Sequence, residues 1–357
     1  MLKKDLALGL TQITLVVSLP IVSTAAIADN DPVKLPDCAS ILEDAARLSC
    51  YDKLFPPQSE KDKLATQAVR ENPAIDVKTS TADKQDIPFK QSNLPLAMYW
   101  ETDAKYKRGV FAFRPHNDNY FLLAKYSSVV NNSPFQATLT NLPSNERKLN
   151  NVEAAFQLSF KMKTLEDIPY THSDLWFGYT QQSFWQAYSK RLSSPFRDTN
   201  YQPEVMLVTP LSWSLLGANI RFLNVGVVHQ SNGRSTTLSR SWNRTYAQLG
   251  IETGKVETLF RVWKRWNEAA SSDDNPDITN YMGHGDIVST YRWDNQKLSL
   301  MLRRNFSTNR GATQLTWSFP VKEYLNGYIN IFSGYGESLI DYNFYQRSIG
   351  IGFLVDY

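Results

Sequence analysis

The sequence is short of the residues that build metal or disulfide scaffolds. Its 357 residues contain only two cysteines and four histidines, which excludes a cysteine-rich metal protein. The formal net charge is only +3, so the composition does not favour a nucleic-acid partner. Repeated runs of about 20 apolar residues are also missing, and this excludes a bundle of transmembrane helices.

Aromatic residues, in contrast, are abundant and unevenly placed. They make up 13% of the chain, which does not fit a disordered protein. Only Tyr51, Phe55 and Phe89 lie before residue 96, and every other aromatic residue lies in 96–357. We therefore expect one folded domain at 96–357.

The first apolar stretch has the features of a signal peptide. Lys3 and Lys4 precede a mostly apolar run over 6–22, and Ala26-Ile27-Ala28 is a cleavage-like site. Residues 1–28 are therefore predicted to be a signal peptide. A transmembrane anchor is the alternative, but polar residues interrupt the run and no basic stop-transfer flank follows.

Two further segments separate the signal peptide from the folded domain. Residues 29–56 contain Cys38 and Cys50, and export favours a disulfide bond between them over two free thiols. Helical spacing over 41–48 predicts a short helix there. Residues 57–95 are polar, interrupted by prolines and without a sustained period, which indicates a flexible periplasmic linker. A tethering role for 29–95 stays open.

Apolar residues alternate with polar or small ones in the C-terminal 262 residues. The pattern is clear over 156–162, 313–319 and 349–357, and a period of two is typical of β-strands with one apolar face. Twelve candidate strands follow: 120–126, 153–162, 173–182, 202–209, 218–229, 242–249, 255–266, 286–293, 297–305, 311–319, 325–333 and 346–357.

A soluble β-sandwich also alternates, so other features must decide the architecture. The chain carries an export signal, aromatic residues gather at strand ends, and the last strand finishes on Tyr357. An even strand count suits a membrane barrel, and a spanning sheet must close because lipid leaves unpaired backbone groups unsatisfied. We therefore predict an all-β fold: a twelve-stranded antiparallel transmembrane β-barrel with a short, partly helical and partly disordered N-terminal extension.

The stretch 224–246 carries the strongest chemical signal. His229 and Ser231 are two apart on a strand, which places them on one face about 7 Å apart along it. A neighbouring imidazole can activate a serine hydroxyl. Asn243 opens the next strand, where hairpin pairing can bring its amide oxygen to the imidazole. The pattern is short, so a purely structural role is its alternative.

The consecutive residues His172, Ser173 and Asp174 are a second set of triad residue types. Neighbours in a strand face opposite sides, so these three are assigned to a loop or an aromatic girdle rather than to catalysis.

The motif HQSNGRS at 229–235, followed by SRSWNR at 239–244, closely resembles the active-site block of the bacterial outer membrane phospholipase A family. Further similar segments occur in order over roughly 110–357: YTQQSFWQ (179–186), SSPFRDTNYQPE (193–204), DDNPDITNYMG (273–283) and SGYGESLIDYN (333–343). The N-terminal part, with both cysteines, lies outside this resemblance.

The resemblance implies a twelve-stranded outer-membrane barrel that hydrolyses phospholipid acyl esters on its lipid-facing wall, with A1, A2 and lysophospholipase activity. It implies that His229 is the base, Ser231 the nucleophile and Asn243 the orienting group. The backbone N–H of Gly233 would stabilise the oxyanion.

The same resemblance implies Ca²⁺ as cofactor. The ligands would be the Arg234 carbonyl, the Ser239 hydroxyl and the carbonyl of the partner subunit's Ser193, an oxygen set that suits a hard cation. Asp274 resembles a position that contributes to calcium binding in the monomer, although a turn-forming carboxylate is the alternative. Two positions depart from some relatives: Gln230 replaces an acid and is expected on the opposite strand face, and Thr237 replaces a proline.

The resemblance further implies that the homodimer is the active form. Gln181 resembles a polar residue at the family's dimer seam, and a location in the barrel lumen is its alternative. The competing function class is a porin-like or structural barrel without hydrolase activity. A lumen of twelve strands is small and is expected to be filled by side chains, which disfavours that class.

Overall fold

The computed structural model describes residues 41, 43–54, 95–135 and 148–355, and the chain divides into two units, 1–84 and 85–357. The predicted signal peptide, Cys38, the linker up to residue 94 and Tyr357 lie outside the described residues. In the first unit, α1 (Asp44–Leu54) begins three residues after the start of the predicted helical spacing, and Cys50 is disulfide-bonded. No helix in the described part of the chain is long and apolar enough to cross a membrane.

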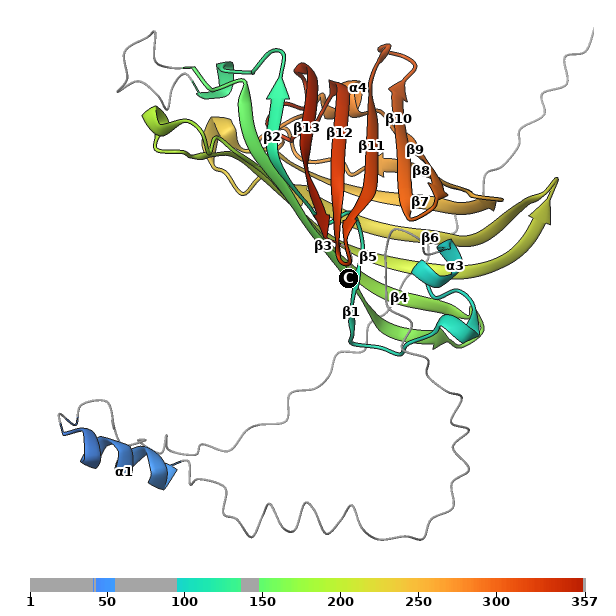
Figure 1. The fold of residues 1–357 in the computed structure, drawn as a ribbon, viewed down its shortest axis with the longest axis horizontal. Helices are drawn as coiled ribbons and strands as arrows, with labels where there is room; N and C mark the ends of the chain where they lie inside the picture. Colours follow the sequence, from blue (N-terminus) through green and yellow to red (C-terminus); the bar gives the residue numbers. More distant parts are fainter. Residues whose placement is uncertain (1–40, 42, 55–94, 136–147, 356–357) are drawn as a thin grey trace, which may run out of the picture. The chain divides into compact units, whose positions relative to one another are not determined.

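The second unit is a closed antiparallel barrel of twelve strands, which confirms the predicted fold class (Figure 1). The described strands are β2 (Tyr120–Ser127), β3 (Val152–Ile168), β4 (Ser173–Trp185), β5 (Phe196–Leu215), β6 (Ala218–Ser231), β7 (Ser241–Thr253), β8 (Val256–Arg265), β9 (Gly285–Trp293), β10 (Gln296–Asn305), β11 (Arg310–Lys322), β12 (Leu325–Tyr335) and β13 (Tyr345–Val355). Each pairs with the next in sequence, and β13 pairs with β2 to close the sheet.

Each predicted segment falls on one of these strands, but several strands are longer than predicted. One predicted segment ends at 209, whereas β5 continues past Pro210 to Leu215 through a register shift between Pro210 and Trp213. The alternation also misses β1 (Phe113–Pro115), which pairs with residues 160–162 of β3 beyond the end of β2. Three residues are too few for a period to show.

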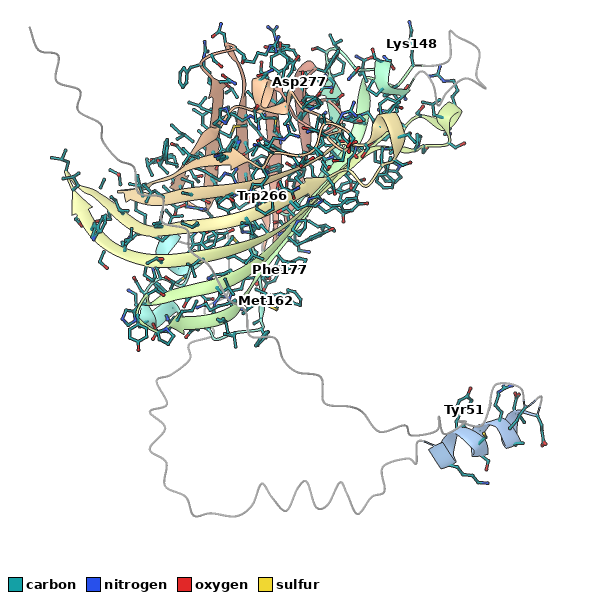
Figure 2. All side chains as sticks on the ribbon, turned by 180° about the vertical axis from the view of Figure 1, so that it is seen from behind. Tyr51, Lys148, Met162, Phe177, Trp266 and Asp277 are labelled. Atoms are coloured by element: carbon teal, nitrogen blue, oxygen red, sulfur yellow. The ribbon has the colours of Figure 1, made fainter. Side chains whose placement is uncertain are left out.

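Side chains alternate between an apolar outer wall and a polar lumen. Along β6, Val225 and Val227 are exposed whereas Gly226 and Val228 are buried. Met162 and Phe177, partners across β3 and β4, mark the outer wall in Figure 2. Large apolar residues exposed on this wall include Leu158, Val205, Leu300, Leu302, Ile349 and Ile351. An apolar exterior around a polar interior is the pattern of a barrel surrounded by lipid.

The two ends of the barrel differ in the length of their connections. At one end, residues 216–217, 254–255, 294–295 and 323–324 form two-residue turns. Leu216 and Gly217 both have positive φ (51° and 81°), as the type I′ hairpin turn requires. The other end carries one short connection, 306–309, and long ones over 186–195, 232–240, 266–284 and 336–344, with α4 (Ile278–Met282) among them (Figure 1).

The chain that precedes β1 fills part of the lumen. Within it, α3 (Leu96–Tyr99) and the short helix η3 (Ala104–Tyr106) lead to β1. Leu96 and Trp100 pack in one buried cluster with Trp176 and Phe222 of the wall strands. The Lys161 ammonium donates to the Tyr99 carbonyl over 2.8 Å and lies 3.6 Å from the Trp100 ring centroid.

A buried carboxylate fixes this segment as well. Glu101 is fully buried and forms ion pairs with Arg114, with Arg108 (2.8 Å) and with Lys163 (3.0 Å). Such a site is stable only when every charge keeps its partner. A polar cavity of about 420 Å³ remains in the lumen. The inner segment, defined as residues 96–103, therefore lies in the lumen, and its contacts with Lys161 and Lys163 are near the β3 end that leads into the turn before β4.

Candidate active site

The hairpin of β6 and β7 places His229 opposite Asn243. The imidazole Nδ1 lies 2.9 Å from the Asn243 amide oxygen Oδ1. Because an amide oxygen can only accept, a hydrogen bond here requires the imidazole proton on Nδ1, which leaves on Nε2 the lone pair that a base needs. The contact that the hairpin pattern predicted is thus present between these two side chains.

This pair lies on the outer wall of the barrel. His229 is exposed on the same face of β6 as Val225 and Val227. Gln230 faces the lumen, where its amide oxygen accepts from Trp242 Nε1 (2.9 Å) and from the Arg244 guanidinium (3.2 Å). Gln230 therefore lies on the face away from the site, as the period of two predicts.

Ser231 ends β6 on the face that bears His229. Its cross-strand partners are Tyr201 of β5 and Ser241 of β7. Its hydroxyl makes no hydrogen bond to the imidazole among the described residues, and such contacts are often longer without substrate than in the reacting complex. The backbone therefore places Ser231 and His229 two residues apart on one face of β6.

The loop after Ser231 is built on a glycine and an asparagine. Gly233 has a φ of +61°, and a Cβ at this position would lie 3.0 Å from a ring carbon of Tyr201, so a larger residue is both strained and crowded. The buried Asn232 amide accepts from the Arg234 N–H (3.3 Å) and the Arg240 N–H (3.0 Å).

Asn232 also donates, to the Leu238 carbonyl (2.9 Å) and to the Asp198 carboxylate (3.3 Å). One side chain thus holds both ends of the 232–240 connection. Sequence reasoning missed this residue, although Asn-Gly directly after a strand is a recognisable turn signal.

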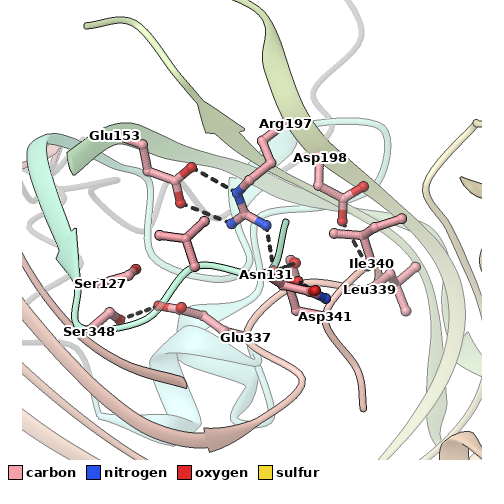
Figure 3. A network of polar contacts seen from close by, with 12 residues as sticks. Ser127, Asn131, Glu153, Arg197, Asp198, Glu337, Leu339, Ile340, Asp341 and Ser348 are labelled. Carbon is pink, nitrogen blue, oxygen red and sulfur yellow. Dashed lines mark hydrogen bonds and ion pairs between the residues drawn. The ribbon is translucent and has the colours of Figure 1, made fainter. Parts of the chain in front are cut away.

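Beneath this loop, a buried network ties three parts of the chain together (Figure 3). Asp198 of β5 accepts from the Ile340 N–H (3.1 Å), and Arg197 donates twice to Glu153 of β3 at 2.9 Å. The guanidinium also pairs with Asp341 of the 336–344 connection. Since these charges are buried, loss of one partner costs more than loss of a surface ion pair.

The candidate calcium ligands are only partly brought together. The Ser239 hydroxyl lies 2.6 Å from an Asp274 carboxylate oxygen, and Asp274 is exposed and makes no ion pair with the described residues. The Arg234 guanidinium donates to the carbonyls of Phe196 and Arg197 at 2.8 Å each, which holds Arg234 at the start of β5.

Ser193 lies three residues before β5, in the left-handed conformation with a φ of +58°, and makes no hydrogen bond to the other candidate ligands in the described part of the chain. No cluster of three or more His, Cys, Asp or Glu side chains suited to a metal occurs among the described residues. Hydroxyl, carboxylate and carbonyl oxygens nevertheless form a donor set that fits Ca²⁺.

Gln181 lies on the outer wall rather than in the lumen. Its cross-strand partner on β3 is Leu158, which is 55% exposed, and its amide oxygen accepts from the Tyr179 hydroxyl (3.1 Å). Its partner on β5 is Tyr201, the residue that also pairs with Ser231. Two strand spacings, about 10 Å, therefore separate Gln181 from the candidate nucleophile.

The second set of triad residue types does not come together. His172 lies 2.9 Å from Asp167 in the exposed turn between β3 and β4, whereas Asp174 is buried and pairs with Lys163 (2.8 Å). The Ser173 hydroxyl contacts Thr209 instead of the imidazole. These residues support the turn and the strand, as the alternation predicts.

These observations describe a lipid-facing barrel wall that carries a histidine, an asparagine and a serine, and comparison with known proteins identifies the class. Residues 96–355 match the family model described as Phospholipase A1, and the chain belongs to this family. Its members are outer-membrane barrels that hydrolyse lipid esters, which confirms the resemblance found in the sequence.

The relatives include a putative phospholipase A1 of Neisseria meningitidis serogroup B, 38% identical over 343 residues that cover 89% of each chain. The matched part, 89% of this chain, is longer than the 262 residues from 96 onward. The similarity therefore extends into the N-terminal part, whereas the sequence motifs placed the start of the resemblance near residue 110. Phospholipase A1 of Escherichia coli K12 is 37% identical over 271 residues, which cover 76% of this chain and 89% of the relative.

Two solved structures have the same fold. The outer membrane phospholipase A from Escherichia coli superposes with a TM-score of 0.63 and 35% identity, covering 69% of this chain and 98% of that one. The Salmonella typhi outer membrane phospholipase, crystallised as a dimer with bound calcium, gives a TM-score of 0.65 and 33% identity, with coverages of 72% and 96%.

Proposed function

We propose that this protein is a calcium-dependent outer-membrane phospholipase that hydrolyses acyl ester bonds of phospholipids and lysophospholipids, at the A1 and A2 positions, through Ser231, His229 and Asn243. The observation that carries the proposal is the 2.9 Å contact between His229 Nδ1 and Asn243 Oδ1 on the outer wall, two residues from Ser231. A substrate ester in the surrounding lipid meets this wall without leaving the membrane.

In the first half-reaction, the Ser231 hydroxyl attacks the acyl carbonyl while His229 Nε2 accepts its proton. The neutral Asn243 amide oxygen holds the imidazolium that forms. The Gly233 N–H donates to the oxyanion, a contribution often worth about 3–4 kcal/mol per donor. His229 then gives the proton to the leaving glycerol oxygen, and the acyl group stays on Ser231.

In the second half-reaction, His229 Nε2 removes a proton from water, and the resulting hydroxide attacks the acyl carbonyl. The ester bond to Ser231 breaks, the serine oxygen regains the proton, and a fatty acid leaves. The 232–240 loop keeps the Gly233 N–H in place through both steps, because Asn232 holds its ends.

The oxygens of Arg234, Ser239 and Asp274, with the carbonyl of the partner subunit's Ser193, are the proposed calcium ligands. Bound calcium supplies positive charge beside the developing oxyanion. Because one chain supplies few of these oxygens, we expect it to bind calcium weakly on its own. The bound calcium of the Salmonella typhi relative supports calcium as the cofactor.

The active form is proposed to be a homodimer with Gln181 at its seam. A polar amide on a lipid-facing wall is unfavourable until it is paired, and a two-fold axis lets two copies pair with each other. The short separation between Gln181 and Ser231 allows the same contact to border the substrate site. The dimer of the Salmonella typhi relative supports the proposal.

The location follows from the lengths of the connections. Membrane barrels carry short turns on the periplasmic side and longer loops outside. His229 and Ser231 are at the end of β6 that leads into a long connection, so the site is proposed to act at the outer leaflet. The proposed organisation is a signal peptide (1–28), a periplasmic cysteine-containing segment (29–56), a linker (57–95) and the barrel (96–357).

The deciding assay compares the wild type with Ser231→Ala for fatty-acid release from phospholipid in mixed micelles, with and without a chelator. We expect activity to fall at least 1000-fold in Ser231→Ala. Ser289→Ala is the matched control, because Ser289 lies on the outer wall of β9, away from His229. Full activity of Ser231→Ala would remove Ser231 as the nucleophile. Conductance in planar bilayers without any esterase activity in the wild type would favour the porin-like alternative instead.

A further inference from the structure

Asn243 has a second partner, on the side of its amide that faces away from His229. Its Nδ2 donates to the Glu268 carboxylate over 3.3 Å. Glu268 belongs to the 266–284 connection, which is distant in sequence from the motif that carries the serine and the histidine. The contacts therefore run from His229 through the Asn243 amide to a carboxylate.

The backbone around Glu268 is anchored to the strand that bears Asn243. The Trp266 N–H donates to the Asn243 carbonyl (2.9 Å), and the Trp266 indole N–H donates to the Thr245 hydroxyl (2.9 Å). Trp266 is marked on the ribbon in Figure 2. These two bonds extend the pairing of β7 and β8 by one residue and hold the chain two residues later beside the Asn243 side chain.

The Glu268 carboxylate makes no close ion pair with the other described residues. Its side chain is 17% exposed, and the nearest cation, the Arg265 guanidinium, is 3.9 Å away. Arg265 lies closer to Asp273, at 2.5 Å. Among the described residues, Asn243 Nδ2 is thus the hydrogen-bond donor to the Glu268 carboxylate.

The chemistry of an amide explains why such a partner matters. An asparagine side chain offers an acceptor on one branch and a donor on the other, and a half-turn exchanges them. A carboxylate accepts only, so it selects the orientation in which Nδ2 faces Glu268 and Oδ1 faces the imidazole. The opposite orientation would present a donor to His229 Nδ1 and favour the tautomer that cannot act as the base.

The charge of Glu268 has a second effect. Asn243 is neutral where many triads carry an aspartate, so it gives the imidazolium no ionic partner. A carboxylate bound to the far side of the amide polarises it and strengthens the hydrogen bond to the ring.

We infer that Glu268 is a positioning residue of this site, which fixes the Asn243 amide and thereby the Nδ1–H tautomer of His229. The inference rests on the proposed function, but it concerns a contact that can be measured without turnover.

The first test is spectroscopic. The chain has only four histidines, so ¹⁵N-histidine labelling of the full-length protein in detergent micelles resolves the tautomer of each ring. We expect His229 to be protonated on Nδ1 in the wild type and to show a mixed tautomer in Glu268→Gln, because glutamine can donate as well as accept. An unchanged tautomer in Glu268→Gln would overturn the inference, even if the wild type proved inactive.

The second test is kinetic, at saturating calcium. We expect Glu268→Gln to lower kcat about 5- to 10-fold with little change in KM, the effect of losing one charge-assisted hydrogen bond. Glu268→Asp should recover part of kcat. Glu323→Gln, in the exposed turn between β11 and β12, is the matched control for loss of one negative charge.

A double-mutant cycle separates positioning from other roles. In an Asn243→Ala background, adding Glu268→Gln should change kcat less than twofold, since the amide to be positioned is gone. A full additional loss in that background would overturn the inference. So would an effect that disappears when calcium is raised, because Glu268 would then belong to the metal site. Inactivity of the wild type, or full activity of Ser231→Ala, would instead contradict the proposed function.

Discussion

Replacing Asn232 with alanine tests whether the loop after the nucleophile must be held rigid for catalysis. The substitution removes four hydrogen bonds, two that the amide accepts and two that it donates. Each is worth about 1 kcal/mol net, but Arg234 and Arg240 are only half-buried, so water can replace part of what is lost. A loss of about 2–3 kcal/mol in loop stability remains.

That loss should appear in the rate rather than in the fold. If the open loop becomes the main population, a loss of about 2–3 kcal/mol lowers kcat by up to about 30- to 160-fold. The calcium concentration for half-maximal activity should rise as well, because Arg234 and Ser239 lie in the same loop. The assay is fatty-acid release from micellar phospholipid across a calcium titration, with barrel content checked by circular dichroism.

Asn305→Ala provides a matched control in a different loop. The Asn305 amide is also buried, accepts from the N–H groups of Ser307 (2.9 Å) and Thr308 (3.3 Å), and donates to the Thr279 carbonyl (2.8 Å). Its removal should cost similar local stability and leave kcat within about twofold of the wild type. Equal kcat values for the two variants would refute the reasoning.

Three further changes should each give a distinct result. Gly233→Ala places a Cβ against Tyr201 at positive φ, about 1–2 kcal/mol of strain, and should lower kcat about 10-fold or more without loss of folded barrel. Arg197→Met leaves the buried Glu153 carboxylate without its bidentate partner and should reduce the unfolding free energy by about 3–5 kcal/mol in a urea titration. Asp274→Asn should raise the calcium requirement several-fold, measured as half-maximal activity after chelator treatment, and an unchanged requirement would remove Asp274 from the metal site.

The sequence predicted the barrel well because its signal is local. The alternation of apolar and polar residues can be recognised within a few consecutive residues. Each of the twelve predicted segments lies on one strand of the closed sheet. Strand ends were predicted less well than strand positions. Pro210 is an example, because a bulge lets β5 continue past a residue that normally interrupts a strand.

The candidate site divides in the same way. The pairing of His229 with Asn243 follows from one hairpin and from the resemblance of one contiguous block. The contacts of Asn232 with Asp198, and of Asn243 with Glu268, join residues 34 and 25 positions apart. They depend on how long connections fold over the end of the barrel, and no periodicity or short motif encodes that.

The inner segment has a consequence for the order in which the barrel is assembled. The same chain leaves the lumen, passes through β1 and becomes β2, the strand that forms the closing seam with β13. Residues 96–103 must therefore be placed inside before, or while, the seam is completed. A barrel that closed without them would enclose Lys163 and Arg114 without the carboxylate of Glu101. Because a buried charge without its partner is costly, closure is disfavoured until the N-terminal segment is in place.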